Sequence, residues 1–339
     1  MTQFTKRNRH YLLVTGANGF LGSEIVRQAI GAGLGVRATG RRDVSRLSEV
    51  EYHRANILDP NSLIPSLDGV EVVIHSAGLA HVFKKSKSSD AHFQEINEKG
   101  TANAIRMAAQ VGVQHFILIS SVSVYGGSTR SGCDENAACH PDGPYAESKW
   151  RAEQRAIEIA KASGTSLTIL RMATIYGEED LGNVGRLMRT IDQGRFLWVG
   201  DGSNRKSLIH REDAARACLH ALHEPNPGIN VYNISAPPCT MRDVVDGLAS
   251  ALGRQVPNWR VPASVALMFI GLASRLTWRH GRLGDLHATL RKWLADDVYD
   301  ASKFEKTFNF RAKVKLSEGL IREVAWYRKY NQSIITEQS

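Results

Sequence analysis

The chain has 339 residues, of which 42% are hydrophobic and 23% charged, a composition typical of a globular protein. Its length predicts one large domain with a smaller companion. The formal charge of +9 is not accompanied by a nucleic-acid-binding motif, and the four cysteines include no C-x-x-C pair and no nearby His at ligand spacing. We therefore exclude nucleic acid as a partner, a metal site and a disulfide framework. Because no signal-peptide pattern is visible at the start, we expect a cytoplasmic protein.

Short apolar strands alternate with helical patterns through the first half of the chain. This alternation predicts a parallel sheet with helices on both faces, and therefore an α/β fold. The sequence predicts strands at 11–15, 35–39, 71–75, 116–120 and 167–170, and helices at 22–31, 97–110 and 145–162.

After Gly177, glycines and prolines divide the chain into loop-rich stretches. We expect these segments to leave the sheet, return near residues 205–235 and leave again. The prediction is a large domain at 9–177 with this returning segment, and a smaller lobe built from 178–204 and 236–330.

The most apolar stretch of the chain, residues 261–273, is shorter than the ~20 residues that span a bilayer. Basic residues follow it at Arg275, Arg279 and Arg282. The pattern favours a buried helix of the smaller lobe. Two alternatives remain open: a peripheral membrane contact by residues 261–282, or an oligomer contact.

A glycine-rich loop, Gly16-Ala17-Asn18-Gly19-Phe20-Leu21-Gly22, follows the first predicted strand and opens a helix. Glycines permit a tight turn and let backbone N–H groups approach a pyrophosphate, to which the helix N-terminus adds partial positive charge. This context predicts a dinucleotide cofactor that is contacted by Gly16, Asn18, Gly19, Phe20 and Leu21.

The end of the second predicted strand carries Arg41 and Arg42 where an acidic residue would hold the ribose of NAD. Two guanidinium groups suit a 2′-phosphate, because Arg makes bidentate charge-assisted contacts. The sequence thus favours NADP and leaves NAD possible. Alternatively, both arginines lie on a solvated loop.

Three motifs carry a family resemblance. They are T-G-A-N-G-F-L-G at residues 15–22, S-S-V-S-V-Y-G at 120–126 and P-Y-A-E-S-K at 144–149. Together they resemble the extended short-chain dehydrogenase/reductase family, also called the NAD-dependent epimerase/dehydratase family, of the nucleotide-sugar-modifying type. The resemblance implies a Rossmann-like, doubly wound parallel sheet with a smaller, mostly C-terminal substrate-binding lobe. It also implies a small-molecule substrate, most simply a nucleotide sugar, and a possible homodimer.

The resemblance places three catalytic residues at Ser121, Tyr145 and Lys149. Tyr145 and Lys149 are four apart on a predicted helix and so share a face. A free phenol has a pKa of about 10, and we expect the ammonium of Lys149 and an oxidised nicotinamide together to lower the pKa of Tyr145 toward neutrality. Tyr145 would carry the proton, Lys149 would also hold the nicotinamide ribose, and Ser121 would bond the reacting oxygen.

The same resemblance assigns supporting residues. Asn97 either orders the active-site strand or caps a helix. Residues near the cofactor are Asn56, Ile57, Ala77, Gly78 and Asn97, together with Tyr145 and Lys149. Residues near the substrate are Ser123, Thr174, Asn183 and Arg205.

Departures from the family pattern reduce the number of reactions that the chain is expected to catalyse. Dehydratases of the family carry an acidic pair where this chain has Val122 and Ser123, and many epimerases have Asn in place of Thr174. We therefore favour an NAD(P)-dependent oxidoreductase that reduces a 4-keto nucleotide sugar. The alternatives are a nucleotide-sugar 4-epimerase with tightly bound NAD, and a hydroxysteroid-type or lipid 3-oxo reductase. A sensor that only binds NAD(P) is disfavoured, because Tyr145 and Lys149 are intact.

Overall fold

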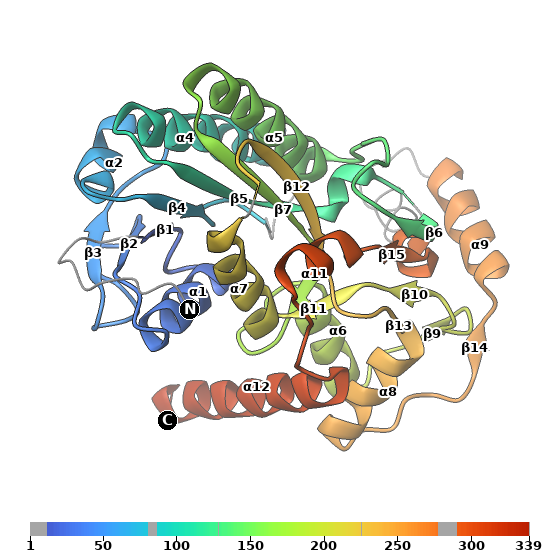
Figure 1. The fold of residues 1–339 in the computed structure, drawn as a ribbon. Coiled ribbons are helices and arrows are strands. Elements are labelled where there is room, and N and C mark those ends of the chain that lie inside the picture. The colour runs from blue at the N-terminus through green and yellow to red at the C-terminus, as the bar shows by residue number, and fades with distance from the viewer. Residues whose placement is uncertain (1–11, 81–86, 128, 225, 277–289, 339) are drawn as a thin grey trace.

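The computed structural model describes residues 12–80, 87–127, 129–224, 226–276 and 290–338. Its centre is a parallel sheet of seven strands in the order β12-β7-β5-β4-β1-β2-β3 (Figure 1). The strands are β1 (Leu12–Thr15), β2 (Val36–Gly40), β3 (Glu51–Arg54), β4 (Val72–His75), β5 (His115–Ser121), β7 (Ser166–Met172) and β12 (Ile229–Ile234). This is the Rossmann-like α/β fold that the sequence predicts.

The strand order reverses between β1 and β4, which are hydrogen-bonded neighbours with Thr15 opposite His75. From β1 the chain proceeds outward through β2 to β3, and from β4 it proceeds the other way through β5 to β7. In open parallel sheets, ligands bind at such a reversal, outside the carboxyl ends of the strands. The loops after β1 and β4 therefore define where a site is expected.

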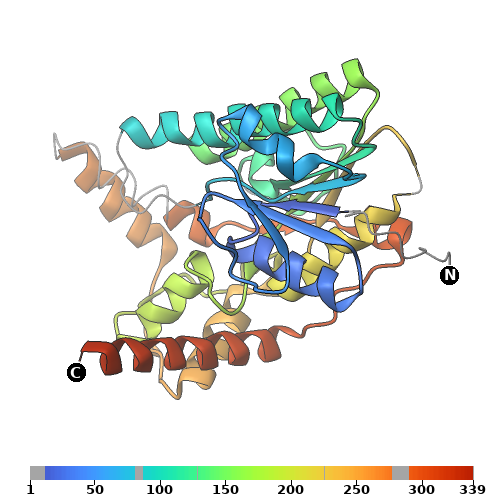
Figure 2. The same cartoon turned by 90° about the vertical axis from the view of Figure 1, so that its left-hand side faces the viewer.

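Helices cover both faces of this sheet, and each face has its own hydrophobic core (Figures 1 and 2). One face is covered by α1 (Phe20–Gly31), α7 (Arg211–His220) and α11 (Ser302–Phe308). The other face is covered by α2 (Pro60–Leu67), α4 (Gly100–Gln110) and α5 (Pro144–Ser163). Because both faces are covered, the central strands are almost wholly buried, with Leu12, Leu13 and Val14 fully inaccessible, whereas the edge strand β3 is not.

The helix predicted at 97–110 is two elements in the structure. A π-helical segment, Gln94–Lys99, runs into α4 without a break, and it is preceded by α3 (Lys87–Phe93). Asn97 therefore lies inside a helical segment, and the N-cap of α4 is Lys99. The interpretation of Asn97 as a helix cap is wrong. π-helical turns are rare and are frequently found at functional sites.

The remaining strands form smaller sheets in the other half of the molecule. A four-stranded sheet has the order β13-β10-β15-β6, and β11-β8 and β14-β9 are two-stranded. Their bounds are β6 (Thr129–Cys133), β8 (Thr174–Tyr176), β9 (Trp198–Val199), β10 (Arg205–Lys206), β11 (Leu208–His210), β13 (Cys239–Thr240), β14 (Arg260–Val261) and β15 (Asp297–Tyr299). Short 3-10 turns occur at Val122–Tyr125 and Ala221–His223.

A third hydrophobic core lies beneath α6 (Asn183–Asp192), α8 (Met241–Leu252) and α12 (Leu316–Gln338). It contains Trp198, Met188 and Val245 among its fully covered side chains. Phe304 and Phe310 instead belong to the α1–α7 face of the large sheet, although they lie inside the segment that the sequence assigned to the lobe. The chain thus returns to the large sheet a second time.

The apolar stretch at 261–273 forms most of α9 (Ala263–Leu276), which projects from one edge of the molecule (Figures 1 and 2). Met268 and Phe269 are each 62% exposed. The favoured interpretation of a buried helix is therefore wrong for this part of the chain, because the described outer face of α9 has no covering element. Within the described residues, no helix is long and apolar enough to cross a membrane.

Candidate active site

The glycine-rich loop after β1 is shaped by two close backbone approaches. Gly16 has a φ of +68°, and a Cβ added there would lie 2.7 Å from the backbone of Ala77, which follows β4. A Cβ on Gly22 would lie 2.2 Å from the carbonyl oxygen of Gly16. Only glycine fits at these positions, because both neighbours are backbone atoms.

Helix α1 begins at Phe20, two residues earlier than predicted, with Gly19 as its N-cap. Since glycine has no side chain, no capping group covers the N–H groups of the first turn, which includes Phe20 and Leu21. These groups and the helix dipole form an anion site at the carboxyl end of β1.

A cavity of about 290 Å³ lies beside this loop, at the carboxyl ends of β1 to β4. It brings together most of the predicted cofactor residues, namely Gly16, Asn18, Gly19, Arg41, Arg42, Asn56, Ile57, Ala77 and Gly78. Sequence reasoning missed further lining residues, namely Thr15, Thr39, Gly40, Ala55, Leu58, Ser76, Leu79 and Ile96. Their positions in the sequence could have predicted them, because nearly all of them lie just where strands of the large sheet end. The glycine cradle, the uncovered helix N-terminus and this cavity together fit a dinucleotide.

Asn18 holds the loop that follows β2. Its side-chain amide donates to the carbonyl oxygen of Val44 at 3.0 Å, and its side-chain oxygen accepts from the backbone N–H of Arg46 at 2.8 Å. Arg41 and Arg42 lie in the first part of the same loop and are exposed at the cavity. Asn18 thus positions the rim of the cavity through its side chain.

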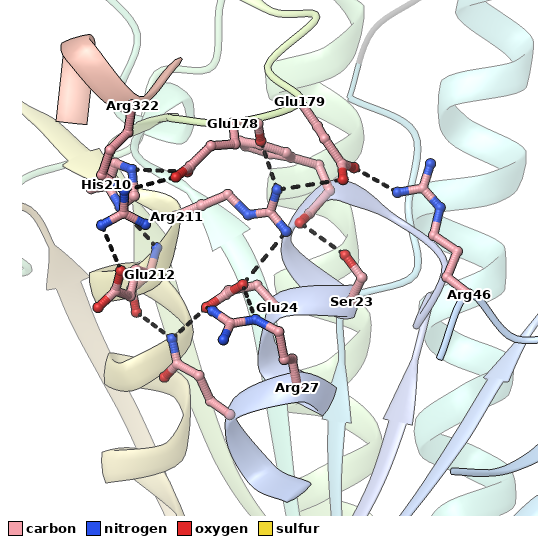
Figure 3. Close-up of polar contacts among 12 residues, drawn as sticks. Ser23, Glu24, Arg27, Arg46, Glu178, Glu179, His210, Arg211, Glu212 and Arg322 are labelled. Atoms are coloured by element: carbon pink, nitrogen blue, oxygen red, sulfur yellow. Dashed lines mark hydrogen bonds and ion pairs between the residues drawn. The ribbon is translucent and has the colours of Figure 1, made fainter. Parts of the chain in front are cut away.

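A network of charged groups connects α1 to the segment that follows β8 (Figure 3). Arg211 donates to the carbonyl oxygen of Glu178 at 2.6 Å, and its guanidinium lies 5.1 Å from the ring centroid of Phe20. Glu179, whose φ of +71° is unusual for a residue other than glycine, pairs with Arg46 at 2.6 Å. The network therefore fixes the 178–179 segment against α1 and the rim loop.

Tyr145 and Lys149 lie one turn apart on α5, which begins with Pro144 at its first position. The Lys149 ammonium donates to the carbonyl oxygen of Ile119 on β5 at 2.8 Å. A Cβ on Gly78 would lie 3.5 Å from the same Nζ atom, so Lys149 lies beside a residue that lines the cavity, although neither Lys149 nor Tyr145 lines it. The ring of Tyr145 meets Phe93 edge-on, with 5.8 Å between centroids.

Ser121 is the last residue of β5, and its hydroxyl accepts from the backbone N–H of Ser123 at 3.1 Å. Burial raises the pKa of Tyr145, and the hydrogen bond with Ser121 acts in the opposite direction. In the chain alone, therefore, Lys149 does not lower the pKa of Tyr145, which is half of the predicted effect. The reason is physical: the phenol is desolvated, while the ammonium is directed at the Ile119 carbonyl.

Burial also lowers the pKa of Lys149 to about 8, with the carboxylate of Glu153 opposing this shift. Lys149 is thus mostly a cation at neutral pH. His75, which ends β4, has its pKa lowered to about 3 by burial and by the Lys149 charge. A neutral His75 lies 2.9 Å from the Thr15 hydroxyl, so it packs between strands, as expected of a structural histidine.

Asn97 joins two parts of the site. Its side chain accepts from the backbone N–H of Leu79 at 2.7 Å and donates to the hydroxyl of Ser148 at 2.9 Å. Ser148 in turn donates to the carbonyl oxygen of Tyr145 at 2.8 Å. Asn97 therefore fixes the loop after β4 against the first turn of α5.

The predicted substrate residues lie on separate elements. Ser123 follows β5, and its hydroxyl oxygen is buried with no hydrogen-bond partner among the described residues. Thr174 begins β8, and Asn183 begins α6, where its side-chain oxygen accepts from Arg186 at 3.0 Å. Arg205 begins β10, and its backbone N–H donates to Asp296 at 2.7 Å. In the described part of the chain, no hydrogen bond or ion pair joins these four residues to one another.

Comparison with known proteins gives the family. The model of the NAD dependent epimerase/dehydratase family matches residues 12–235. The chain therefore belongs to this family of NAD-dependent enzymes within the extended short-chain dehydrogenases/reductases.

Individual relatives extend over nearly the whole chain. It is 28% identical, over 93% of its length and 94% of the relative's, to the N-acetyl-alpha-D-glucosaminyl-diphospho-ditrans,octacis-undecaprenol 4-epimerase of Escherichia coli O157:H7. It is 27% identical, over 91% of its length and 92% of the relative's, to the UDP-glucose 4-epimerase of Vibrio cholerae. The solved structure of MoeE5 in complex with UDP-glucuronic acid and NAD is similar with a TM-score of 0.76 at 25% identity, covering 94% of this chain and 99% of that one.

Proposed function

We propose that the chain is an NAD-dependent 4-epimerase of a sugar carried on a diphosphate, with Ser121, Tyr145 and Lys149 as catalytic residues. The observation that carries this proposal is the approach of the Lys149 Nζ atom to Gly78, which lines a cavity that fits a dinucleotide, with Tyr145 one turn away on α5. NAD, when bound, supplies a hydride acceptor and donor for the carbon that bears oxygen.

The residues divide the remaining work. The Lys149 ammonium, held at the Ile119 carbonyl, is placed to bond the ribose hydroxyls of the cofactor. Ser121 and Tyr145 together hold the sugar oxygen, and Tyr145 removes a proton from it and later returns that proton. Because burial alone raises the pKa of Tyr145, ionisation of the phenol depends on positive charge in the completed complex.

Epimerisation is favoured over dehydration by the residues after β5. Val122 is buried and Ser123 is neutral, so no acid is placed there to expel water. The two curated relatives described above are named as 4-epimerases, one of a UDP-sugar and one of a sugar on a polyprenyl diphosphate. Both substrates share a sugar diphosphate.

The substrate would extend from Tyr145 toward the smaller lobe at 178–204 and 236–330, beyond the cofactor domain at 9–177. The partnerless hydroxyl of Ser123 is suited to bond the sugar. Thr174, Asn183 and the exposed Arg205 would contact the diphosphate and its carrier.

A second candidate is a 4-ketoreductase that uses NADPH. Arg41 and Arg42 favour it, because both side chains are exposed at the cavity where a 2′-phosphate would lie. In that case Arg41→Asp should weaken the use of NADPH about tenfold or more, with little effect on the use of NADH.

The two candidates differ in what they consume. We expect the purified protein to interconvert UDP-N-acetylglucosamine or UDP-glucose with its 4-epimer without added reductant, as measured by chromatography of the two sugars. Absence of interconversion, together with net oxidation of NADPH in the presence of a 4-keto-sugar nucleotide, would replace the epimerase with the reductase. Inactivity in both assays would contradict the assignment to sugar diphosphates.

A further inference from the structure

Helix α9 presents an apolar outer face. Val265, Met268 and Phe269 are spaced as i, i+3 and i+4, so they lie on one side of the helix. All three are exposed, whereas Ala263, Ala266 and Leu267 are partly covered. In both ribbon views α9 stands at the edge of the molecule, away from the large sheet (Figures 1 and 2).

The strand pair that precedes α9 is flanked by further exposed apolar residues. Strand β14 leads directly into α9 and pairs with β9, with Arg260 opposite Trp198. The residues just before this pair, Trp259 and Leu197, are 58% and 53% exposed. Exposed apolar groups in one region mark an interaction surface more often than scattered single residues do. Tryptophan is also enriched where proteins meet the headgroup layer of a membrane.

Positive charge is concentrated in the same part of the chain. The described residues 254–276 and 290–292, the basic segment, contain five Lys or Arg and no Asp or Glu. Arg254, Arg260 and Lys292 are exposed. An apolar helix face within a basic segment is the pattern of a helix that lies on an anionic membrane surface.

This surface lies close to the proposed active site. Lys292 pairs with Asp142 at 3.6 Å, and Asp142 comes three residues before Tyr145. Lys292 therefore lies beside the segment that leads into α5, where the reacting end of the substrate is proposed to lie. A membrane surface that held α9 would be near the mouth of the site.

We propose that α9 docks on an anionic bilayer surface through Val265, Met268, Phe269 and Trp259, and that the site accepts a sugar diphosphate carried on a membrane lipid. The second half of this statement rests on the proposed function. The bilayer supplies both complementary features: an apolar layer for the α9 face and negative headgroups for the basic segment. Each Lys or Arg near such a surface strengthens binding about fivefold.

The test is flotation with lipid vesicles. We expect the full-length protein to float with vesicles of phosphatidylglycerol and phosphatidylcholine, but weakly with phosphatidylcholine alone, and to be released by high salt. Phe269→Glu should reduce vesicle affinity at least tenfold, because it replaces an apolar contact with a negative charge. Ile321→Glu is the matched control: Ile321 is 58% exposed on α12, and the variant carries the same change in charge.

Three outcomes would overturn the proposal: no flotation of the wild type, equal flotation of the Phe269→Glu and Ile321→Glu variants, or loss of a dimer in Phe269→Glu without any vesicle binding. The last result would make the α9 face a contact between two copies. Turnover of a soluble UDP-sugar, measured with the same preparations, should be unchanged in both variants. If flotation is intact and turnover is absent in every preparation, the proposed function fails and the membrane contact stands.

Discussion

The large sheet and the smaller lobe each bury a glutamate, but in opposite electrostatic settings. Glu153 on α5 is fully buried and receives three hydrogen bonds from Arg171, the shortest at 2.7 Å, as well as one from Ser120. Glu323 on α12 is also fully buried, yet neither carboxyl oxygen has a hydrogen-bond partner among the described residues. A buried carboxylate keeps its charge only where a partner compensates for lost hydration.

This difference matches the positions of the two residues. Glu153 lies one turn beyond Lys149 and raises the Lys149 pKa against the effect of burial, so its charge supports a cation at the proposed active site. Arg171 continues the network to the Tyr125 hydroxyl at 2.8 Å, which donates to Asn233 on β12 at 2.8 Å. Fixed charge is thus concentrated around the ends of β5, β7 and β12. Glu323 supports no comparable network, and burial together with Asp180 raises its pKa to about 9.

The first prediction has the largest expected effect. It tests whether the catalytic proton transfer is carried out by a residue that packs on the large sheet. Tyr145→Phe removes the hydroxyl that is proposed to carry the proton, and proton transfer by a positioned side chain contributes about 10²–10⁴-fold. Turnover should fall by that factor while NAD binding, followed by fluorescence, stays within about twofold. Tyr330→Phe, at an exposed tyrosine of α12, should leave both unchanged. Retained turnover in Tyr145→Phe would remove Tyr145 from the mechanism.

The second prediction concerns Glu323 and the pH dependence of stability. With a folded pKa of about 9 and an ordinary value of 4.5, Glu323 binds a proton more tightly in the folded state. Its contribution to stability is therefore most favourable below pH 4.5 and declines as the pH rises toward 9. Glu323→Gln removes this decline and should raise the free energy of unfolding at pH 7 by roughly 3 kcal/mol. Denaturant unfolding at several pH values measures this effect.

Glu153→Gln is the matched control for Glu323→Gln. The same substitution there leaves the Arg171 guanidinium buried without a countercharge, so it should destabilise the fold by about 3 kcal/mol or more. Opposite signs for the two variants would confirm the contrast between the two regions. If both variants lower the free energy of unfolding by similar amounts, Glu323 is stabilised by a charged partner as Glu153 is, and the proposed difference between the two regions is wrong.

The sequence predicted the glycine-rich loop and its cofactor cavity better than it predicted the packing of the smaller lobe, and the reason is physical. Gly16, Gly19 and Gly22 act within one strand–loop–helix unit, so their spacing alone carries the geometry. The pairing of Glu153 with Arg171 depends on a helix packing against a strand, and the sequence does not display it. The outer face of α9 was predicted as buried because its pattern is apolar, whereas exposure depends on what else packs there. The Tyr145 pKa direction was missed because desolvation is a property of the folded surroundings.

The smallest predicted effect separates a glycine needed for conformation from one needed for a close approach. Gly16 and Gly33 have nearly the same φ, +68° and +71°, and they flank the two ends of α1. A Cβ on Gly16 would lie 2.7 Å from the Ala77 backbone, whereas a Cβ on Gly33 would meet nothing within 4 Å. Gly33→Ala should lose about 1–2 kcal/mol of stability through backbone strain, and Gly16→Ala should lose more, because the Ala77 backbone must also shift. Only Gly16→Ala should also weaken NAD binding, by about tenfold or ~1.4 kcal/mol, because the cradle must widen to admit the methyl group.

Calorimetric titration of NAD into both variants measures this difference. Equal affinities would show that the approach of β1 to the loop after β4 does not shape the cofactor site.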